Sequence, residues 1–328
     1  MLNLLVVWTT TRCQLRCRYC YVAAGEVPAH DLDPAVFARA LRTLGFARGG
    51  EIQIAGGEPG LVPDVMAEVA RLGRAAGAGR IGVQTNGLAI DDAFIDTVKR
   101  HRLGVGVSLD GPPEVNDRVR GQTARVLAGL ARLEAAAVPF GITAVVCRDS
   151  VETLPDLVLL LGTFAHVKSI GLDVVRPAGR GSEDDLPSPA AVRLAYEGMA
   201  ANLAWINRRR AAPIRLREAA AVGCAPKDGA YCATEAGTGA VLTADGRVFP
   251  CGSLVGFAGY DCGTADAPDL ERLGRGVRPE RPGCAACEVA GCRGRCPSRA
   301  AVSVRAAALD CVLRRAASAR RRSETAGP

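Results

Sequence analysis

Three cysteines close to the amino terminus are spaced so that their thiols can meet at one point. They are Cys13, Cys17 and Cys20, and they follow an apolar, strand-like segment, Leu4–Trp8. Three thiolates can hold a [4Fe-4S] cluster and leave one iron open to a small molecule. A structural zinc site needs a fourth ligand, and neither His30 nor another nearby cysteine supplies one at ordinary spacing. The pattern therefore favours an open iron-sulfur cluster over zinc or plain thiols.

A second set of cysteines lies in the last third of the chain. The sequence has 13 cysteines, an odd number that fits a disulfide framework poorly. Eight of them have spacings typical of metal or cluster binding: Cys224, Cys232, Cys251, Cys284, Cys287, Cys292, Cys296 and Cys311. Four thiolates suit zinc as well as iron, so a zinc-ribbon interpretation of residues 284–296 stays open. Two separate metal-bearing regions are expected.

The remaining cysteines and the histidines have no ligand spacing. We expect Cys147, which follows a predicted strand, to be a buried core thiol. For Cys262 a substrate or redox role stays open beside a structural one. His30, His101 and His166 are expected to be ordinary solvated side chains.

Composition is typical of a folded protein with two domains. The chain has 328 residues, of which 48% are hydrophobic and 23% charged. It has neither an apolar run of about 20 residues nor a signal peptide, which predicts a cytoplasmic protein without a membrane partner. The net charge of +7 comes largely from arginines after residue 313, and aromatic residues make up only 4%. We therefore expect a basic tail and no nucleic-acid partner.

Six strand-like segments alternate with helical patterns over the first 175 residues. A helix, for example, is predicted from Phe37, Ala40 and Leu41, behind an Asp33 cap with Pro34 at its first position. Six units are too few for a complete eight-fold barrel of about 250 residues, so the fold class is α/β with a partial (β/α)6 TIM-like barrel. The expected strands are Leu4–Trp8, Glu51–Ala55, Arg80–Gln84, Gly104–Leu109, Phe140–Val146 and Ser169–Val175.

The first cysteine group resembles the signature of the radical S-adenosylmethionine (radical SAM) superfamily. That signature is CxxxCxxC after the first strand of a partial barrel, with an aromatic residue before the third cysteine, here Tyr19. The resemblance implies that the open iron binds S-adenosylmethionine. It further implies reductive cleavage to methionine and a 5'-deoxyadenosyl radical, which takes hydrogen from a substrate.

Motifs at later strand ends extend the resemblance. Gly56, Gly57 and Glu58 resemble the family's GGE motif, which meets the ammonium group of S-adenosylmethionine. Asn86 lies in another shared element. By resemblance, Ser108 and Arg120 bind the carboxylate of S-adenosylmethionine, and a guanidinium can grip a carboxylate with two hydrogen bonds. Asp110 is expected either to act directly or to cap a turn.

The C-terminal cysteines resemble those of the SPASM subgroup, whose cysteine-rich domain carries two auxiliary [4Fe-4S] clusters. One gap is a residue shorter than is common there. By resemblance, Cys311 joins Cys284, Cys287 and Cys292, while Cys224, Cys232, Cys251 and Cys296 hold the other cluster. Metal, more than a large apolar core, is expected to organise this region. The expected domains are a radical SAM barrel (1–186), a helical linker (187–215), an iron-sulfur SPASM domain (216–313) and a disordered basic tail (314–328).

Proteins of this subgroup mostly modify peptides, so the resemblance implies a maturase of a ribosomally made precursor peptide. A thioether or carbon-carbon crosslink is a typical product, and the auxiliary clusters would accept the electron left on the substrate. A flavodoxin- or ferredoxin-type reductant is expected. Because the chain begins at its first strand, we expect the peptide's leader to be recognised by the barrel, the SPASM surface or a separate leader-binding protein.

Three alternatives stay open. The first is radical oxidation or rearrangement of a small molecule such as a sugar or amino-acid derivative. The second, sulfatase maturation, is disfavoured because Gly252 stands where anaerobic sulfatase maturases carry an aspartate base. The third is a non-catalytic iron-sulfur or zinc scaffold.

Overall fold

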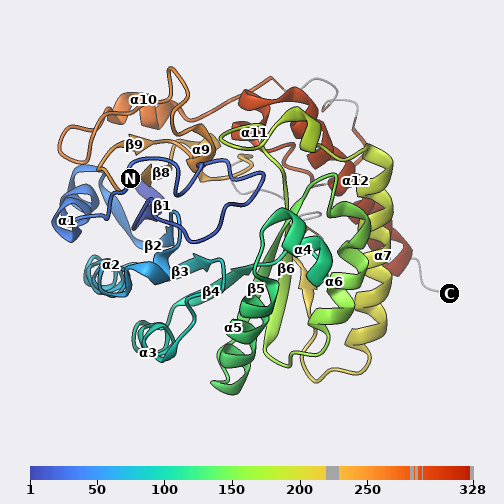
Figure 1. Cartoon of the computed structure of the whole chain (residues 1–328). Coiled ribbons are helices and arrows are strands. Elements are labelled where there is room, and N and C mark those ends of the chain that lie inside the picture. Colours follow the sequence, from blue (N-terminus) through green and yellow to red (C-terminus); the bar gives the residue numbers. More distant parts are fainter. Residues whose placement is uncertain (219–228, 281–283, 285–286, 290, 326–328) are drawn as a thin grey trace.

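The computed structural model describes residues 1–218, 229–280, 284, 287–289 and 291–325, with side chains as far as Arg320. A single curved sheet dominates it, in the order β7-β6-β5-β4-β3-β2-β1-β8-β9 (Figure 1). All neighbouring strands are parallel except β8 and β9. The strands are β1 (Leu2–Trp8), β2 (Phe46–Ala55), β3 (Arg80–Thr85), β4 (Gly104–Ser108), β5 (Phe140–Val146), β6 (Val167–Val174), β7 (Arg215–Leu216), β8 (Gly239–Leu242) and β9 (Val248–Phe249).

Helices cover the outer face of the sheet. Helix α1 begins where the Asp33 side chain accepts a hydrogen bond from the Ala35 amide, and it buries Phe37, Ala40 and Leu41. The helices of the barrel are α1 (Pro34–Thr43), α2 (Pro63–Ala75), α3 (Asp92–His101), α4 (Pro113–Val119), α5 (Thr123–Ala135), α6 (Leu154–Leu161) and α7 (Pro189–Asn207). Because sequential parallel strands are joined by these helices, the predicted partial (β/α)6 barrel is confirmed.

The apolar core lies between the sheet and the helices. Along β5, Phe140, Ile142, Ala144 and Val146 are buried, while the residues between them are only partly buried. The same alternation on β2, β3 and β4 turns one apolar face outward towards the helices. Each predicted strand is present, and β2 begins five residues earlier than expected, at Phe46.

The C-terminal region shares the barrel's sheet. Strand β8 pairs with β1, and β9 continues the sheet from β8. Leu242 and Val248 belong to the main apolar core. Two short apolar strands of this region therefore extend the barrel's sheet, and its expected organisation by metal stays a prediction. The other elements here are α9 (Ala233–Ala236), α10 (Leu270–Arg275), α11 (Pro297–Val302) and α12 (Val304–Thr325).

The basic tail differs from its prediction. Residues 314–325 continue helix α12 and are not a disordered segment. Leu309, Leu313, Ala316 and Ala317 are buried, at a spacing that forms one apolar stripe, and α12 packs against α7 (Figure 1). Of the arginines that suggested a frayed tail, Arg315 and Arg320 are exposed on this helix, and Arg314 is partly buried. Within the described part of the chain, no helix is long and apolar enough to cross a membrane.

Candidate active site and metal centres

The loop after β1 holds the first three cysteines in a fixed turn. The Cys20 amide donates to the Cys17 carbonyl at 3.2 Å. Arg180 donates from Nε to the Cys17 carbonyl at 2.9 Å, and from its amide to the Cys20 carbonyl at 3.0 Å. Arg16 donates to the Cys13 carbonyl at 2.8 Å. Two arginines thus fix the carbonyls of this loop, which leaves the thiols for a ligand.

The three thiols lie near one another. Burial raises the pKa of Cys13 and of Cys17, and the neighbouring thiols raise both further. Arg120 opposes this rise at Cys17, because its positive charge stabilises the thiolate. A partly buried group of three thiols beside a guanidinium fits the predicted open [4Fe-4S] cluster.

The GGE motif packs directly against the cysteine loop. The Gly57 amide donates to the Thr10 carbonyl at 2.7 Å, and the Glu58 amide donates to the Arg12 carbonyl at 2.9 Å. A Cβ at Gly57 would overlap the Arg12 carbonyl, and Gly56 has a φ of 129°. Only glycine permits this approach and this backbone conformation. The two glycines therefore bring the motif and the cysteines together.

Glu58 anchors the same segment to the end of β3. Its carboxylate is fully buried and accepts hydrogen bonds from the Gly60 amide at 2.9 Å, from Oγ1 of Thr85 at 2.6 Å and from the Asn86 amide at 2.6 Å. Burial raises the pKa of Glu58, although these bonds partly offset the rise. The structure thus gives Glu58 an anchoring role, and its contact to the ammonium group of S-adenosylmethionine stays a prediction.

Asn86 and Ser108 also lie at the carboxyl ends of their strands. Nδ2 of Asn86 lies 3.7 Å from Sγ of Cys13 and 3.3 Å from Oε1 of Gln14. Oγ of Ser108 accepts a hydrogen bond from Nε2 of Gln84 at 3.0 Å. Both predicted residues therefore lie on the side of the barrel that carries the cysteine loop.

Arg120 is held by an aromatic hydroxyl and a buried carboxylate. Nη1 of Arg120 donates to the Tyr19 hydroxyl at 3.0 Å and lies 3.6 Å from Oδ2 of Asp110. Burial would lower the pKa of Arg120, but Cys17, Asp110 and the other thiols raise it, so the guanidinium stays charged. Asp110 is fully buried, and its Oδ1 accepts from the Val145 amide at 2.7 Å. Asp110 therefore positions Arg120 beside the cysteines. Such an indirect role differs from both expectations, direct action and the capping of a turn.

Three C-terminal cysteines gather at the starts of short helical turns. Cys232, Cys251 and Cys296 each precede one, at α9, at a 3-10 turn (Gly252–Leu254) and at α11. Burial raises the pKa of Cys232 to about 11, and the nearby thiols of Cys296 and Cys251 add to this rise. Cys224, the fourth predicted member, lies outside the described residues.

Four further cysteines surround a cavity of about 210 Å³, which Arg314 and Arg315 also line. Its cysteines are Cys284, Cys287, Cys292 and Cys311. The Gly294 amide donates to Sγ of Cys292 at 3.3 Å. Cys232, Cys251 and Cys296 thus lie near one another, and the other four described cysteines line one cavity. That each group holds a cluster stays a prediction. Within the described ranges, no three His, Cys, Asp or Glu side chains are arranged to hold a metal ion.

A charged network that sequence reasoning missed joins the barrel to the C-terminal region. Asp173, at the end of β6, pairs with Arg176 at 2.5 Å and with Arg299 at 2.6 Å. Arg299 also pairs with Asp310, whose Oδ2 accepts from the Cys296 amide at 3.0 Å. Asp173 and Arg299 lie 126 residues apart, so no local pattern could have indicated the pair.

The two unassigned cysteines are buried. Cys147 is confirmed as a core thiol, with Sγ 3.3 Å from Oγ of Ser150. Cys262 is only 1% exposed and packs in the main apolar core, where Sγ lies 3.6 Å from the Tyr260 carbonyl. The structure therefore gives Cys262 a packing role.

The fold is shared with two solved structures. SuiB of Streptococcus suis, solved with bound S-adenosylmethionine, has a TM-score of 0.71 at 17% identity, with 91% of this chain and 73% of SuiB covered. The enzyme anSMEcpe, solved with bound AdoMet, has a TM-score of 0.75 at 17% identity, with 98% and 99% covered. The fold and the site thus define a class of protein in which a partial barrel with a cysteine loop is joined to a cysteine-rich C-terminal region.

Residues 8–161 match the model of the radical SAM superfamily, which supports the assignment of this part of the chain to that superfamily. An uncharacterized protein of Methanocaldococcus jannaschii, MJ0907, is 31% identical over 183 residues, 53% of this chain and 63% of its own length. A probable GTP 3',8-cyclase of Methanopyrus kandleri is 28% identical over 263 residues, 74% and 78% of the two chains. The PqqA peptide cyclase of Ruegeria pomeroyi is 31% identical over 162 residues, 47% and 43% of the two chains. The chain spans 45% to 63% of the length of the first three curated relatives.

Proposed function

We propose that this chain is a cytoplasmic radical SAM enzyme that oxidatively modifies a ribosomally made precursor peptide. The observation that carries the proposal is the placement of Arg120, which is charged, largely buried and fixed beside three neighbouring thiols. Cys13, Cys17 and Cys20 would hold a [4Fe-4S] cluster, which would supply the electron for reductive cleavage of S-adenosylmethionine.

The residues around the cysteine loop would bind and orient S-adenosylmethionine. Arg120 presents a guanidinium suited to the methionyl carboxylate, and Ser108 offers a hydroxyl nearby on β4. Asn86 fixes the loop through its contacts with Cys13 and Gln14. Because Asp110 is buried and paired with Arg120, the guanidinium is positioned before its ligand arrives.

Two auxiliary [4Fe-4S] clusters are proposed for the C-terminal cysteine groups. Oxidation of a substrate leaves an electron that must be accepted, and a protein-held cluster is a suitable acceptor. The cavity lined by Cys284, Cys287, Cys292 and Cys311 supports one of these sites. The electron for the first step would come from a flavodoxin- or ferredoxin-type reductant.

A peptide substrate is supported by the relatives. A solved structure of SuiB carries its precursor peptide SuiA, and the chain resembles that fold over 94% of its length. One curated relative is a PqqA peptide cyclase. A separate leader-binding protein remains part of the proposal. Sulfatase maturation gains no support, because Gly252 brings no carboxylate to the position beside Tyr21.

A small-molecule substrate is the second candidate. The observation in its favour is the probable GTP 3',8-cyclase of Methanopyrus kandleri, whose similarity extends over 74% of this chain. A sugar or amino-acid derivative would then take the place of the peptide.

The decisive experiment is anaerobic reconstitution with iron and sulfide, followed by reduction with dithionite and an assay for 5'-deoxyadenosine. The wild-type chain should cleave S-adenosylmethionine. Changing Cys13, Cys17 and Cys20 together to Ala should remove about four iron atoms and abolish cleavage. Cys262→Ala is the matched control, because this buried thiol contacts none of the cysteine groups. An absence of dithionite-dependent cleavage by the wild type would refute the proposed activity.

A further inference from the structure

The inside of the barrel contains a cavity of about 340 Å³. In complete (β/α)8 barrels, bulky branched side chains fill this space. Here the inward positions of β3, β4 and β5 include Gly82, Gly106 and Gly141, which leave the space open. A volume of several hundred Å³ is typical of ligand pockets.

The inward glycines make room for polar side chains from the neighbouring strand. A Cβ at Gly82 would lie 2.7 Å from Oε1 of Gln53, closer than such atoms come. A Cβ at Gly171 on β6 would overlap the guanidinium of Arg217, which lies flat across this strand. Likewise, a Cβ at Gly106 would come too close to the side chain of Gln84, and a Cβ at Gly141 would come too close to that of Ser169. The cavity is therefore lined by hydrogen-bonding groups.

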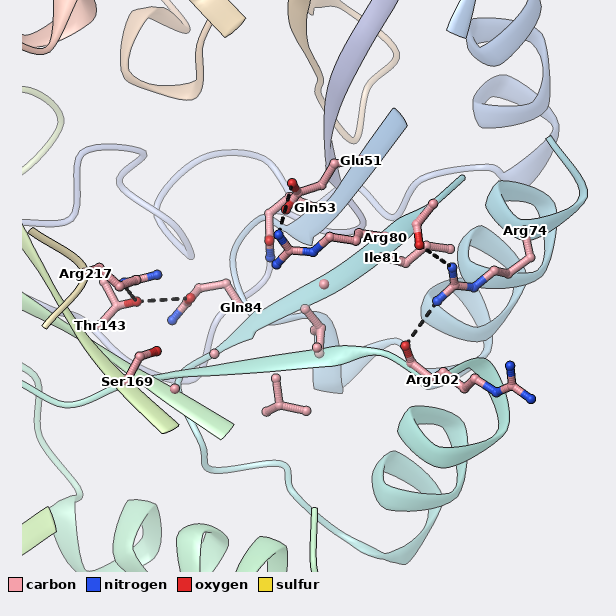
Figure 2. A pocket seen from close by; sticks show the side chains of 17 residues that line it. Glu51, Gln53, Arg74, Arg80, Ile81, Gln84, Arg102, Thr143, Ser169 and Arg217 are labelled. Carbon is pink, nitrogen blue, oxygen red and sulfur yellow. Dashed lines mark hydrogen bonds and ion pairs between the residues drawn. The ribbon is translucent and has the colours of Figure 1, made fainter. Parts of the chain in front are cut away.

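Arg217 is tied to the candidate active site by a chain of hydrogen bonds. Its Nη2 donates to Oγ1 of Thr143 at 2.9 Å, and that hydroxyl donates to Oε1 of Gln84 at 3.4 Å (Figure 2). Gln84 then donates to Ser108, as described above. Asn86, which contacts Cys13, lies two residues after Gln84, or about 7 Å along the strand. A ligand in the cavity would thus lie directly below the cysteine loop.

Arg217 has no ion-pair partner within the residues that the structure describes. Two carboxylates, Asp173 and Glu218, interact with the charge of Arg217 at longer range, but neither forms an ion pair with it. Asp173 pairs with Arg176 and Arg299, and Oε1 of Glu218 accepts from the Leu172 amide at 2.8 Å. The positive charge of Arg217 is therefore available to a ligand.

The rest of the cavity wall is also positively charged. Figure 2 shows Arg74 and Arg102 on the side of the cavity opposite Arg217. Arg74 donates to the carbonyls of Ala78 and His101. Among the lining residues described here, Glu51 is the sole carboxylate, and it lies 3.9 Å from Arg80. The wall as a whole favours an anion.

We propose that this cavity binds a carboxylate group, with Arg217 as its charged ligand and with Gln84 and Ser169 as hydrogen-bond partners. A planar guanidinium recognises a carboxylate through paired hydrogen bonds. The assignment of the carboxylate to the substrate rests on the proposed function. The group would then be an acidic residue of the peptide or, for the second candidate, a free small carboxylic acid.

Titration calorimetry on the reconstituted full chain tests this site. The probes are N-acetyl-glutamate N-methylamide for a peptide residue, glutarate for a free acid, and N-acetyl-glutamine N-methylamide as the neutral control. We expect a carboxylate probe to bind at least about tenfold more tightly than the amide. Arg217→Gln should abolish this preference, while Arg217→Lys should retain part of it. Arg39→Gln, which removes a surface arginine paired with Asp266, should change nothing.

The two carboxylate probes distinguish the source of the group. Tighter binding of the blocked glutamate indicates an acidic peptide residue, and tighter binding of glutarate indicates a free acid; either result supports the site. Equal binding of acid and amide, no binding of either acid, or an unchanged preference in Arg217→Gln would overturn it. If Arg217→Gln fails to fold, Thr143→Val removes the hydroxyl that orients Arg217 and should reduce the preference. Because no S-adenosylmethionine cleavage is measured, failure here is distinct from failure of the proposed activity.

Discussion

The barrel and the C-terminal region position their cysteines in different ways. In the barrel, Arg16 and Arg180 bond the carbonyls of the cysteine loop, and the GGE segment pairs with the backbone that leads into it. In the C-terminal region, Cys232, Cys251 and Cys296 precede helical turns of three to six residues. Turns of this length have few hydrogen bonds of their own. The first site is thus organised by the polypeptide, whereas the others depend more on what they bind.

This difference predicts that damage to the C-terminal groups leaves the first site intact. Cys292→Ala should remove about four iron atoms while S-adenosylmethionine cleavage stays within about twofold of wild type. The reason is that Cys292 lines the cavity shared with Cys284, Cys287 and Cys311, away from the loop after β1. Iron analysis and the 5'-deoxyadenosine assay check this, with Cys262→Ala as control. Loss of cleavage would show that the two regions are not independent in this way, and full retention of iron would show that Cys292 holds no cluster.

The charged network between the regions should matter for stability more than any surface pair. Arg299→Met leaves Asp173 and Asp310 without a shared partner, and the Arg299 side chain is 4% exposed. Removal of one partner from a buried ion pair costs about 3–5 kcal/mol. Denaturant unfolding of the reconstituted chain measures this change in the free energy of unfolding.

The matched control for Arg299 lies on helix α7. Arg193 pairs with Glu197 one helical turn away, and both side chains are about half exposed. Arg193→Met should therefore cost no more than about 0.5 kcal/mol. Similar losses in the two variants would mean that the network does not join the regions.

The sequence predicted the barrel far better than the C-terminal region, and the reason is physical. Alternating burial along β5 and the capped stripe of α1 are local patterns that short stretches of residues determine. The pairing of β8 with β1 joins residues more than 200 positions apart, so no local pattern indicates it. The apolar stripe of α12 was missed because arginines make up much of that segment. The residues that contact α7 include small alanines, which give a weak apolar signal.

In the candidate sites, too, local patterns were predictable from the sequence and long-range contacts were not. Short intervals indicated the group of Cys13, Cys17 and Cys20 and the neighbours Cys284, Cys287 and Cys292. The assignment of the remaining C-terminal cysteines came from the resemblance to the SPASM subgroup. Resemblance singled out Tyr19 and Arg120 separately, and the structure brings their side chains within 3.0 Å of each other. The partners that fix them were not predictable: the contact of Arg180 with Cys17 and the anchoring of Glu58 at Thr85 depend on how the strands lie side by side.

The smallest expected effect concerns a single side chain of the first site. Arg120→Lys keeps the positive charge beside Asp110 but loses the planar fork that would grip a carboxylate. Loss of such a charged hydrogen bond costs about 1.5–3 kcal/mol, so the KM for S-adenosylmethionine should rise by roughly ten- to a hundredfold. Arg18→Lys is the matched control, because Arg18 lies in the cysteine loop yet pairs with Asp149 on the surface. Since the polypeptide alone organises this site, iron content should stay at the wild-type level in both variants. An unchanged KM in Arg120→Lys would mean that Arg120 serves the thiols and not the ligand that they hold.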